Sequence, residues 1–280
     1  MAPRKHIIGG TAPLSVDSRQ RRILDELQAR GSCTYREFEK LLGVSSMTVR
    51  RDVDVLAKRD ALIKTLGGAQ YSNVPQFLYE TALSERIAVN RAEKDIIADS
   101  ALKLVQPQQT LYLDGSSTCI ALARLLAKAQ FALTVITNSA IIAMEVGVSP
   151  TAKVLCLGGD YDPQSASFVG VLAEEACVKF FVDTAFMSTK AFLPEEGMFE
   201  SSIAALRIKQ LMAQRSAKLV LLVDHSKFGQ RSLCRVVAIE AIHTVVTDAK
   251  SPRAALEVLR KGGRQVVVAG GSEPEEPKAA

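Results

Sequence analysis

Residues 44–56 read V-S-S-M-T-V-R-R-D-V-D-V-L, which is the spacing of one amphipathic helix. Val49, Val53 and Leu56 recur at intervals of four and three residues, which predicts that they form one buried stripe. At about 100° per residue, the side chain of Arg51 points almost directly away from that stripe. The exposed face of the predicted helix is therefore small, polar and basic.

The segments before this helix also follow helical patterns. A first helix is expected from Ser18, and Gly31 is expected to end it because glycine readily adopts the left-handed conformation at such a position. A second helix is indicated by Thr34 and Glu37, whose T-x-x-E spacing is that of a capping box, and it ends at Gly43. Three short helices, with a tight turn between the second and the third, predict a helix-turn-helix.

The segment after the third helix predicts a β-wing. Residues 61–71 read A-L-I-K-T-L-G-G-A-Q-Y, which is typical of two short strands around Gly67 and Gly68. A winged helix-turn-helix inserts the N-terminal half of its third helix into the major groove, where Arg reaches guanine edges and Ser or Thr reaches phosphates. The residues expected to contact double-stranded DNA are Ser45, Ser46, Met47, Thr48, Arg50, Arg51 and Lys64.

The distribution of charge supports this expectation. The net charge is +5, and residues 1–70, with 13 Lys or Arg and 8 Asp or Glu, carry all of it. Such a basic first quarter indicates a module that faces a polyanion, although a solvated basic surface is an alternative reading of the charge alone. The acidic residues of the helix are compatible with DNA binding, because Asp54 lies four residues before Lys58 and can pair with it.

Residues 21–69, with G-V-S-S-M-T-V-R-R-D-V-D-V-L and a closing L-G-G-A, resemble the DNA-binding domain of the DeoR/GlpR family of bacterial transcriptional regulators. That family usually has His immediately before its G-G-A, where this chain has Leu66. The resemblance implies a winged helix-turn-helix that binds operator DNA.

The second part of the chain alternates between strand-like and helix-like segments. This alternation predicts an α/β domain whose largely parallel sheet is covered by helices. The strand candidates are residues 110–114, 133–138, 153–158, 184–188, 218–224, 244–248 and 265–269. The helical patterns cover residues 93–105, 117–128, 139–146, 170–181, 201–215 and 252–261.

Polar turns follow the first five predicted strands, and they read L-D-G-S-S-T, T-N-S, L-G-G-D, S-T-K and V-D-H-S-K. Ligands of parallel sheets bind at the carboxyl ends of the strands, so these turns are expected to converge on one anion site. Taken singly, the same residues are also common as helix caps and turn formers. The expected effector-binding residues are Asp114, Ser116, Ser117, Thr118, Asn138, Gly158, Gly159, Lys190, Asp224 and Lys227.

Residues 93–248 extend the family resemblance, through V-I-T-N-S, F-V-D-T-A-F and D-H-S-K-F. They look like the sensor domain of the same regulators, which implies a fold related to ribose-5-phosphate isomerase and a phosphorylated sugar that relieves repression. The first loop of the family commonly reads D-x-G-T-T, whereas Ser116 and Ser117 occupy the Gly and first Thr positions here.

Cysteine and histidine usage argues against several classes of protein. The five Cys include no C-x-x-C pair and there are only three His, so neither a zinc site nor a disulfide framework is expected, and no metal or cofactor is implied. No apolar run approaches the roughly 18 residues of a membrane span. We therefore expect a cytoplasmic protein that does not partner a membrane.

These patterns divide the chain into five segments. Residues 1–17 are expected to be a flexible lead, 18–71 the winged helix-turn-helix, 72–92 a linker, 93–269 the sensor domain and 270–280 a disordered tail.

The leading hypothesis is a DNA-binding transcriptional regulator, not an enzyme, that represses a carbohydrate operon until a phosphorylated sugar binds. It is expected to form at least a homodimer, because such regulators act on repeated half-sites. One alternative is a sugar-phosphate isomerase with an accessory nucleic-acid module, for which Asp114, Asp183 and Glu200 are the available carboxylate bases. Another is an architectural DNA-binding protein without an effector.

Overall fold

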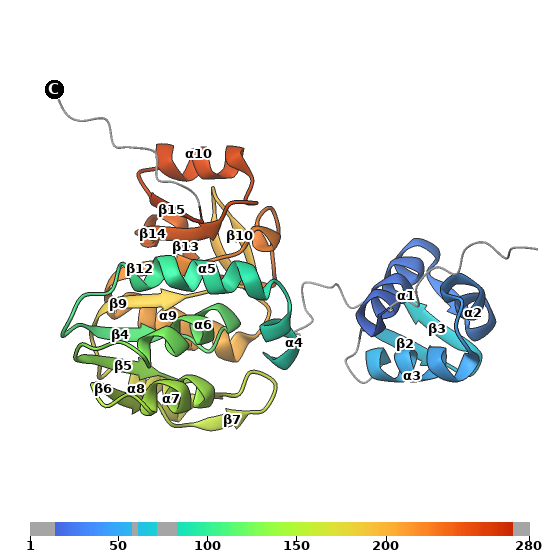
Figure 1. Cartoon of the computed structure of the whole chain (residues 1–280), viewed down its shortest axis with the longest axis horizontal. Coiled ribbons are helices and arrows are strands. Elements are labelled where there is room, and N and C mark those ends of the chain that lie inside the picture. The colour runs from blue at the N-terminus through green and yellow to red at the C-terminus, as the bar shows by residue number, and fades with distance from the viewer. Residues whose placement is uncertain (1–14, 58–60, 72–82, 271–280) are drawn as a thin grey trace, which may run out of the picture. The chain divides into compact units, whose positions relative to one another are not determined.

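The computed structural model describes residues 15–57, 61–71 and 83–270, and the chain forms two units, Met1–Tyr79 and Glu80–Ala280 (Figure 1). The smaller unit comes first in the chain and the larger unit follows it. Each unit has its own hydrophobic core, so the two are described separately.

The smaller unit is a winged helix-turn-helix, as predicted. Val49 and Val53 are fully buried and pack with Ile23, Leu27 and Phe38 in a single core, which confirms the predicted apolar stripe. The helices of this unit are α1 (Val16–Arg30), α2 (Tyr35–Leu42) and α3 (Ser46–Ala57). The strands are β1 (Ser32–Thr34), β2 (Leu62–Thr65) and β3 (Gly68–Tyr71), which pair antiparallel in the order β1-β3-β2.

The ends of these helices follow the expected capping chemistry. The Thr34–Glu37 capping box is present, and Gly43 ends α2 in the left-handed conformation, at φ 66°. Helix α1 begins two residues before the predicted start at Ser18, because the hydroxyl of Ser15 accepts a hydrogen bond from the backbone N–H of Ser18 (3.2 Å). Residues 1–14 of the predicted lead lie outside the described part of the chain.

Strand β1 was not predicted, because it is only three residues long. Its close approach to β3 explains one glycine of the wing: a Cβ atom on Gly68 would lie 2.1 Å from the carbonyl oxygen of Cys33. Only glycine fits where the two backbones are this close.

The larger unit is built on a seven-stranded parallel sheet, which confirms the predicted α/β class. Its strand order is β15-β14-β12-β9-β4-β5-β6, and each strand corresponds to one of the seven predicted candidates. The strands are β4 (Thr110–Leu113), β5 (Leu133–Thr137), β6 (Ala152–Cys156), β9 (Val182–Met187), β12 (Ser216–Leu222), β14 (Thr244–Asp248) and β15 (Gln265–Ala269).

Helices cover both faces of this sheet (Figure 1). Leu111 and Leu113 of β4 face one core, together with α5 (Arg91–Leu102), α6 (Ser117–Leu126) and α7 (Ala140–Gly147). Tyr112 points to the opposite core, because side chains alternate along a strand, and there it meets α8 (Val171–Cys177), α9 (Ile203–Gln214) and α10 (Arg253–Lys261). All six helices were predicted.

The remaining described elements of the larger unit are short and were not predicted as separate helices or strands. The short helix α4 (Leu83–Ala88) and the start of α5 lie within the stretch that was expected to be a linker, and residues 72–82 of that stretch lie outside the described residues. The other strands are β7 (Asp160–Asp162), β8 (Ser167–Val169), β10 (Ala191–Leu193), β11 (Gly197–Glu200) and β13 (Cys234–Ala238). Two single 3₁₀ turns are η2 (His225–Lys227) and η3 (Ile239–Ala241).

None of the helices within residues 15–57 and 83–270 is both long enough and apolar enough to cross a membrane.

Candidate functional site

Helix α3 presents a polar and basic surface at its N-terminal half. Ser45 caps the helix, since its hydroxyl accepts a hydrogen bond from the backbone N–H of Thr48 (3.4 Å). Met47 is 71% exposed, and Ser46 and Thr48 are partly exposed beside it. At the tip of the wing, Leu66 is fully exposed. These side chains are therefore placed where a duplex can reach them.

The two adjacent arginines of α3 differ in their surroundings. The guanidinium of Arg50 lies 4.3 Å from the centre of the Tyr35 ring, a cation–π contact that restrains it. Arg51 is exposed, and among the described residues it has no hydrogen bond or ion pair. Of the two arginines, Arg51 is therefore the one whose guanidinium is open to a base edge.

The wing carries its own ion pair. Lys64 of β2 pairs with Asp54 of α3, and both side chains are about half exposed. The sequence had suggested that Asp54 pairs with Lys58, which lies outside the described residues. The ammonium of Lys64 is thus already paired with a carboxylate of the same unit.

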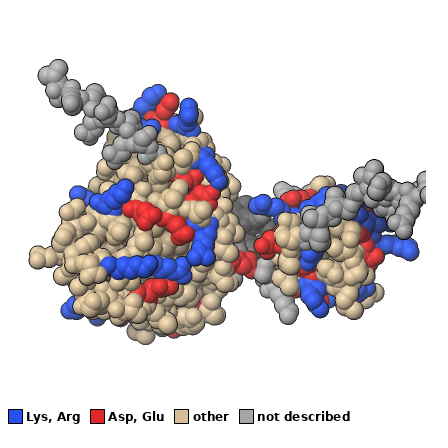
Figure 2. Space-filling model, in the orientation of Figure 1, with Lys and Arg blue, Asp and Glu red and all other residues tan. Residues whose placement is uncertain are grey.

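Charge is arranged differently on the larger unit. Figure 2 shows Lys and Arg side chains next to Asp and Glu side chains on the visible face of that unit, so neither sign dominates this surface. The balanced composition of residues 71–280 agrees with this view.

A cavity of about 160 Å³ lies at the C-terminal edge of the parallel sheet. Turns that follow β4, β5, β9 and β12 all contribute to its lining, as expected for ligand sites of parallel sheets. Eight of the ten residues expected to bind effector line this cavity: Asp114, Ser116, Ser117, Thr118, Asn138, Lys190, Asp224 and Lys227.

Gly158 and Gly159 do not line the cavity, in contrast to the expectation from sequence. They follow β6, which is the edge strand of the sheet, and the β7–β8 hairpin lines the cavity there through Ser165, Ser167 and Val169. Gly159 has φ 147°, and a Cβ atom on it would lie 2.5 Å from the carbonyl oxygen of Val169. This close approach of two backbone segments explains why position 159 is a glycine.

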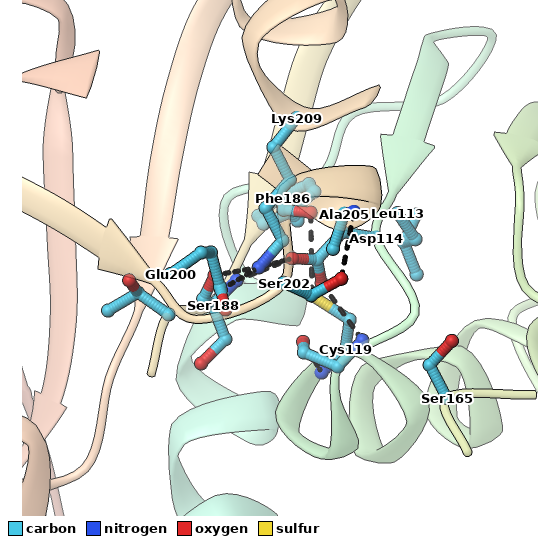
Figure 3. Close-up of polar contacts among 12 residues, drawn as sticks. Leu113, Asp114, Cys119, Ser165, Phe186, Ser188, Glu200, Ser202, Ala205 and Lys209 are labelled. Atoms are coloured by element: carbon cyan, nitrogen blue, oxygen red, sulfur yellow. Dashed lines mark hydrogen bonds and ion pairs between the residues drawn. The ribbon is translucent and has the colours of Figure 1, made fainter. Parts of the chain in front are cut away.

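A buried ion cluster forms one wall of the cavity (Figure 3). The ammonium of Lys209, from α9, lies 3.0 Å from Oδ2 of Asp114 and also pairs with Glu200. It donates a hydrogen bond to the carbonyl oxygen of Ser188 (2.8 Å). Asp114 also accepts hydrogen bonds from the backbone N–H groups of Ser116 and Ser188, both at 3.1 Å.

The charges of this cluster stabilise one another. Burial alone would raise the pKa of Asp114, but the positive charge of Lys209 and the hydrogen bonds outweigh it, so the pKa lies below its usual value. Burial alone would lower the pKa of Lys209, and its two carboxylate partners instead raise it. Asp114 is therefore an anion that holds the turn after β4 in place.

Two other predicted residues are also held by the protein itself. The amide of Asn138 accepts a hydrogen bond from the hydroxyl of Tyr112 (2.9 Å) and donates one to the carbonyl oxygen of Phe168 (3.0 Å), which joins β5 to the hairpin. Asp224 accepts hydrogen bonds from the backbone N–H of Ser226 (3.0 Å) and from the amide of Asn90 (2.9 Å). These side chains shape the cavity.

The start of α6 opens onto the cavity. Ser116 caps this helix by accepting a hydrogen bond from the backbone N–H of Cys119 (3.3 Å), and Ser117 and Thr118 form the first turn. A helix N-terminus favours negative charge, because the N–H groups of its first turn point outward along the helix axis. Lys227, on the turn after β12, adds a positive charge to the same cavity.

Sequence reasoning missed several lining residues, of which Lys94 and Lys209 are the most informative. Lys94 lies on the buried face of α5 with Ile97, Ala98 and Ala101, at the spacing of an apolar helix stripe. A lysine at a position of an otherwise apolar helix stripe is the sequence signal that could have identified Lys94 as a buried residue. Other polar or charged lining residues that the sequence did not indicate are Arg86, Ser165, Ser167 and Ser201, whereas Ser188 and Thr189 belong to the expected S-T-K turn and Glu200 was considered only as a base for the isomerase alternative.

Lys94 is only 5% exposed, and its ammonium hydrogen-bonds to backbone carbonyl oxygens rather than to a carboxylate. Burial lowers the pKa of Lys94 to about 8; the negative charge of Asp224 opposes this shift, and the positive charges of Lys227 and Arg86 add to it. A buried lysine with a strongly lowered pKa that lines a cavity is characteristic of a functional site.

Groups of His, Cys, Asp or Glu that could hold a metal ion are not found within the described ranges.

Two family models match the chain. The DeoR-like helix-turn-helix domain covers residues 19–74, and the DeoR C terminal sensor domain covers residues 89–249. The HTH-type transcriptional regulator GolR of Listeria innocua is 34% identical over 251 residues, which are 90% of this chain and 98% of that protein.

Two further similar relatives are repressors by name. The lactose phosphotransferase system repressor of Lactococcus lactis is 31% identical over 82% of this chain and 90% of that protein. The glycerol-3-phosphate regulon repressor of Escherichia coli is 25% identical over 85% of this chain and 92% of that protein. Among solved structures, ribose 5 phosphate isomerase A from Neisseria gonorrhoeae is 18% identical, with a TM-score of 0.37 over 49% of this chain and 53% of that chain.

Proposed function

Because the chain belongs to the DeoR family of transcriptional regulators, we propose that it represses a carbohydrate-metabolism operon and leaves its operator when a phosphorylated sugar binds. The smaller unit supplies the DNA contact, through the N-terminal half of α3 and the wing. The larger unit supplies the sugar-phosphate site. The cytoplasm is the compartment in which both partners are available.

The observation that carries this proposal is the set of groups that meet at the 160 Å³ cavity. The first turn of α6, with Ser117 and Thr118, offers N–H and hydroxyl donors to a phosphate. Lys94 and Lys227 supply positive charge from two other elements. A phosphate in this position would replace the repulsion between these cations with attraction.

The rest of the cavity suits the hydroxyl groups of a sugar. Ser201 lines it with a buried hydroxyl that has no hydrogen-bond partner among the described residues. The hydroxyls of Ser165 and Ser167 donate to Asp162 and to the carbonyl oxygen of Ser165, and each can still accept a hydrogen bond from a ligand. The volume of the cavity limits the ligand to a small molecule, so a monosaccharide phosphate or a shorter polyol phosphate is the class of effector that fits best.

The partners of the carboxylates considered as bases also favour a sensor over the isomerase alternative. An isomerase needs a carboxylate base beside the sugar carbons, and Asp114 and Glu200 are both paired with Lys209. The third carboxylate considered, Asp183, accepts a hydrogen bond from the backbone N–H of Thr110 at the start of β4 and does not line the cavity. Turnover of ribose 5-phosphate by the purified protein would favour the enzyme and count against this proposal.

The deciding experiment measures the melting temperature of the purified full chain with matched pairs of phosphorylated and unphosphorylated sugars. We expect at least one sugar phosphate to raise the melting temperature while its unphosphorylated partner does not, because only the phosphate engages the cations of the cavity. The same compound should release the protein from operator DNA in a fluorescence anisotropy titration.

Two results would contradict the proposal. If no sugar phosphate raises the melting temperature, an architectural DNA-binding protein without an effector becomes the better interpretation. If a sugar phosphate raises the melting temperature but does not release the protein from DNA, ligand binding in the cavity does not control DNA binding. Light scattering in the presence and absence of operator DNA tests the expected homodimer, since a monomer would not match paired half-sites.

A further inference from the structure

The corner between α4 and α5 forms one wall of the cavity and is also the place where the larger unit receives the chain from the DNA-binding unit. Arg86 and Val89 at the end of α4, and Lys94 in the first turns of α5, all line the cavity. Helix α4 is the first described element after β3, so it is the part of the larger unit that follows the DNA-binding unit in sequence.

Lys94 ties this corner together. Its ammonium donates hydrogen bonds to the carbonyl oxygen of Val89 (2.6 Å) and to that of Arg86. These carbonyl groups lie at the C-terminal end of α4, where a helix leaves backbone acceptors unsatisfied and favours positive charge. Lys94 therefore caps α4 from a neighbouring helix.

The ammonium of Lys94 has one more hydrogen than it has acceptors. An ammonium group has three N–H donors, and among the described residues it has two acceptors. A buried charge with an unused donor is costly, and an anion in the cavity can accept the third hydrogen without displacing the two carbonyl groups.

Asn90 fixes the turn itself. It adopts the left-handed conformation (φ 51°, ψ 41°), and its amide donates hydrogen bonds to Oδ1 of Asp224 (2.9 Å) and to the hydroxyl of Ser226 (3.2 Å). The turn is thereby anchored to the end of β12, next to Lys227, and Lys94 holds the C-terminal end of α4 beside it. The N-terminal end of α4 is fixed separately by Leu83, which is buried in the core and donates its backbone N–H to the carbonyl oxygen of Gln164 (3.0 Å).

We propose that Lys94 couples the cavity to α4: an anion bound at its third donor strengthens its hold on the C-terminal carbonyl groups of α4 and so fixes the segment that leads to the DNA-binding unit. This inference rests on the proposed function, because it assumes that the cavity binds a phosphate. Lys94 is a positioning residue in this scheme, in addition to any contact with the ligand.

Hydrogen exchange of the ligand-free full chain tests the tether without any ligand. In Lys94→Met, which keeps the length and removes the donors, the amides of residues 83–90 should exchange at least about tenfold faster than in wild type. The control is Lys250→Met, which removes the ion pair between Lys250 and Glu93 of α5 (2.6 Å) and leaves α4 untouched. Equal exchange of residues 83–90 in wild type and Lys94→Met overturns the inference.

Inorganic phosphate is the probe for the coupling. Concentrations that raise the melting temperature of wild type should also slow exchange of residues 83–90 several-fold in wild type and Lys250→Met, and should have no such effect in Lys94→Met. Phosphate that raises the melting temperature of wild type while exchange of this segment stays the same or becomes faster overturns the coupling. Absence of any rise in melting temperature counts against the proposed function instead, and the ligand-free comparison still decides the tether.

Discussion

The guanidinium of Arg19 holds the carboxylate of Asp52 through two hydrogen bonds, from Nε to Oδ2 at 2.8 Å and from Nη2 to Oδ1 at 3.3 Å. Asp52 is 3% exposed and follows Arg51 directly in α3. A two-point contact between α1 and α3 fixes the rotation of α3 about its axis. The aspartate beside the exposed arginine therefore has a structural partner and does not oppose DNA.

Replacement of Asp52 by Asn should destabilise the DNA-binding unit by about 1 to 3 kcal/mol, because the partly buried guanidinium of Arg19 loses its charged partner. Calorimetry of the full chain measures this as a lower melting temperature for the transition of that unit. Asp25→Asn on the exposed face of α1 is the control and should change the transition little. Equal effects of the two substitutions would contradict the assigned role.

Replacement of Arg51 by Ala should weaken the preference for operator over random DNA by about 1 to 3 kcal/mol, which is the worth of one good base contact. Competition binding with both DNAs at one fixed salt concentration measures this preference. The matched variant is Arg22→Ala, an exposed arginine of α1, which should leave the preference unchanged. Unaltered discrimination by Arg51→Ala would refute the assignment.

Lys227→Ala and Ser117→Ala should each leave operator affinity intact and raise the sugar-phosphate concentration needed for release by about tenfold or more, since each removes a hydrogen bond to a charged group. Anisotropy titrations of the preformed DNA complex give both quantities. Lys218→Ala is the control for Lys227→Ala, because it removes an exposed lysine at the opposite end of β12. Release at the wild-type concentration would argue against the cavity as the effector site.

The lowered pKa of Lys94 predicts how the stability of the folded chain depends on pH. Its pKa is about 8 in the folded chain, lowered by burial from the usual 10.5, so the folded state binds this proton less tightly than the unfolded state does. The free energy of unfolding therefore rises as the pH rises from about 8 to 10.5, by at most about 1.4 kcal/mol per pH unit. Wild type should gain stability relative to Lys94→Met when the two are compared by chemical unfolding at about pH 7 and about pH 9.5. A constant difference between them would show that Lys94 is not buried as a charge.

Most of the fold could be predicted from local pattern. Each strand of the parallel sheet is a short apolar run bounded by polar turns, and the residues of the apolar stripe of α3 recur at helical spacing. Strands β7, β8 and β10 have three residues each, too few to show an alternation of inward and outward side chains. Their positions depend on long-range pairing, which local pattern does not contain.

The lining residues on the turns after the strands could be predicted from the sequence, and the lining residues on the helices could not. The turns after β4 and β12 could be placed together because parallel strands end at one edge of a sheet. Lys94 and Lys209 belong to helices, and an isolated lysine on a helix is usually solvent-exposed or reaches water with its end. The burial of Lys209 depends on Asp114, which is distant from it in sequence, and the burial of Lys94 depends on the corner at α4, which was taken for a linker.

Lys94 and Lys227 meet at one cavity, where their positive charges repel each other, and this repulsion has an evolutionary consequence. Neutral residues at these positions would remove a repulsion and make the ligand-free protein more resistant to heat. Under the proposed function, selection for thermostability alone would therefore be expected to recover repressors that stay on DNA permanently, because the groups that weaken the empty molecule are the ones proposed to bind the metabolite.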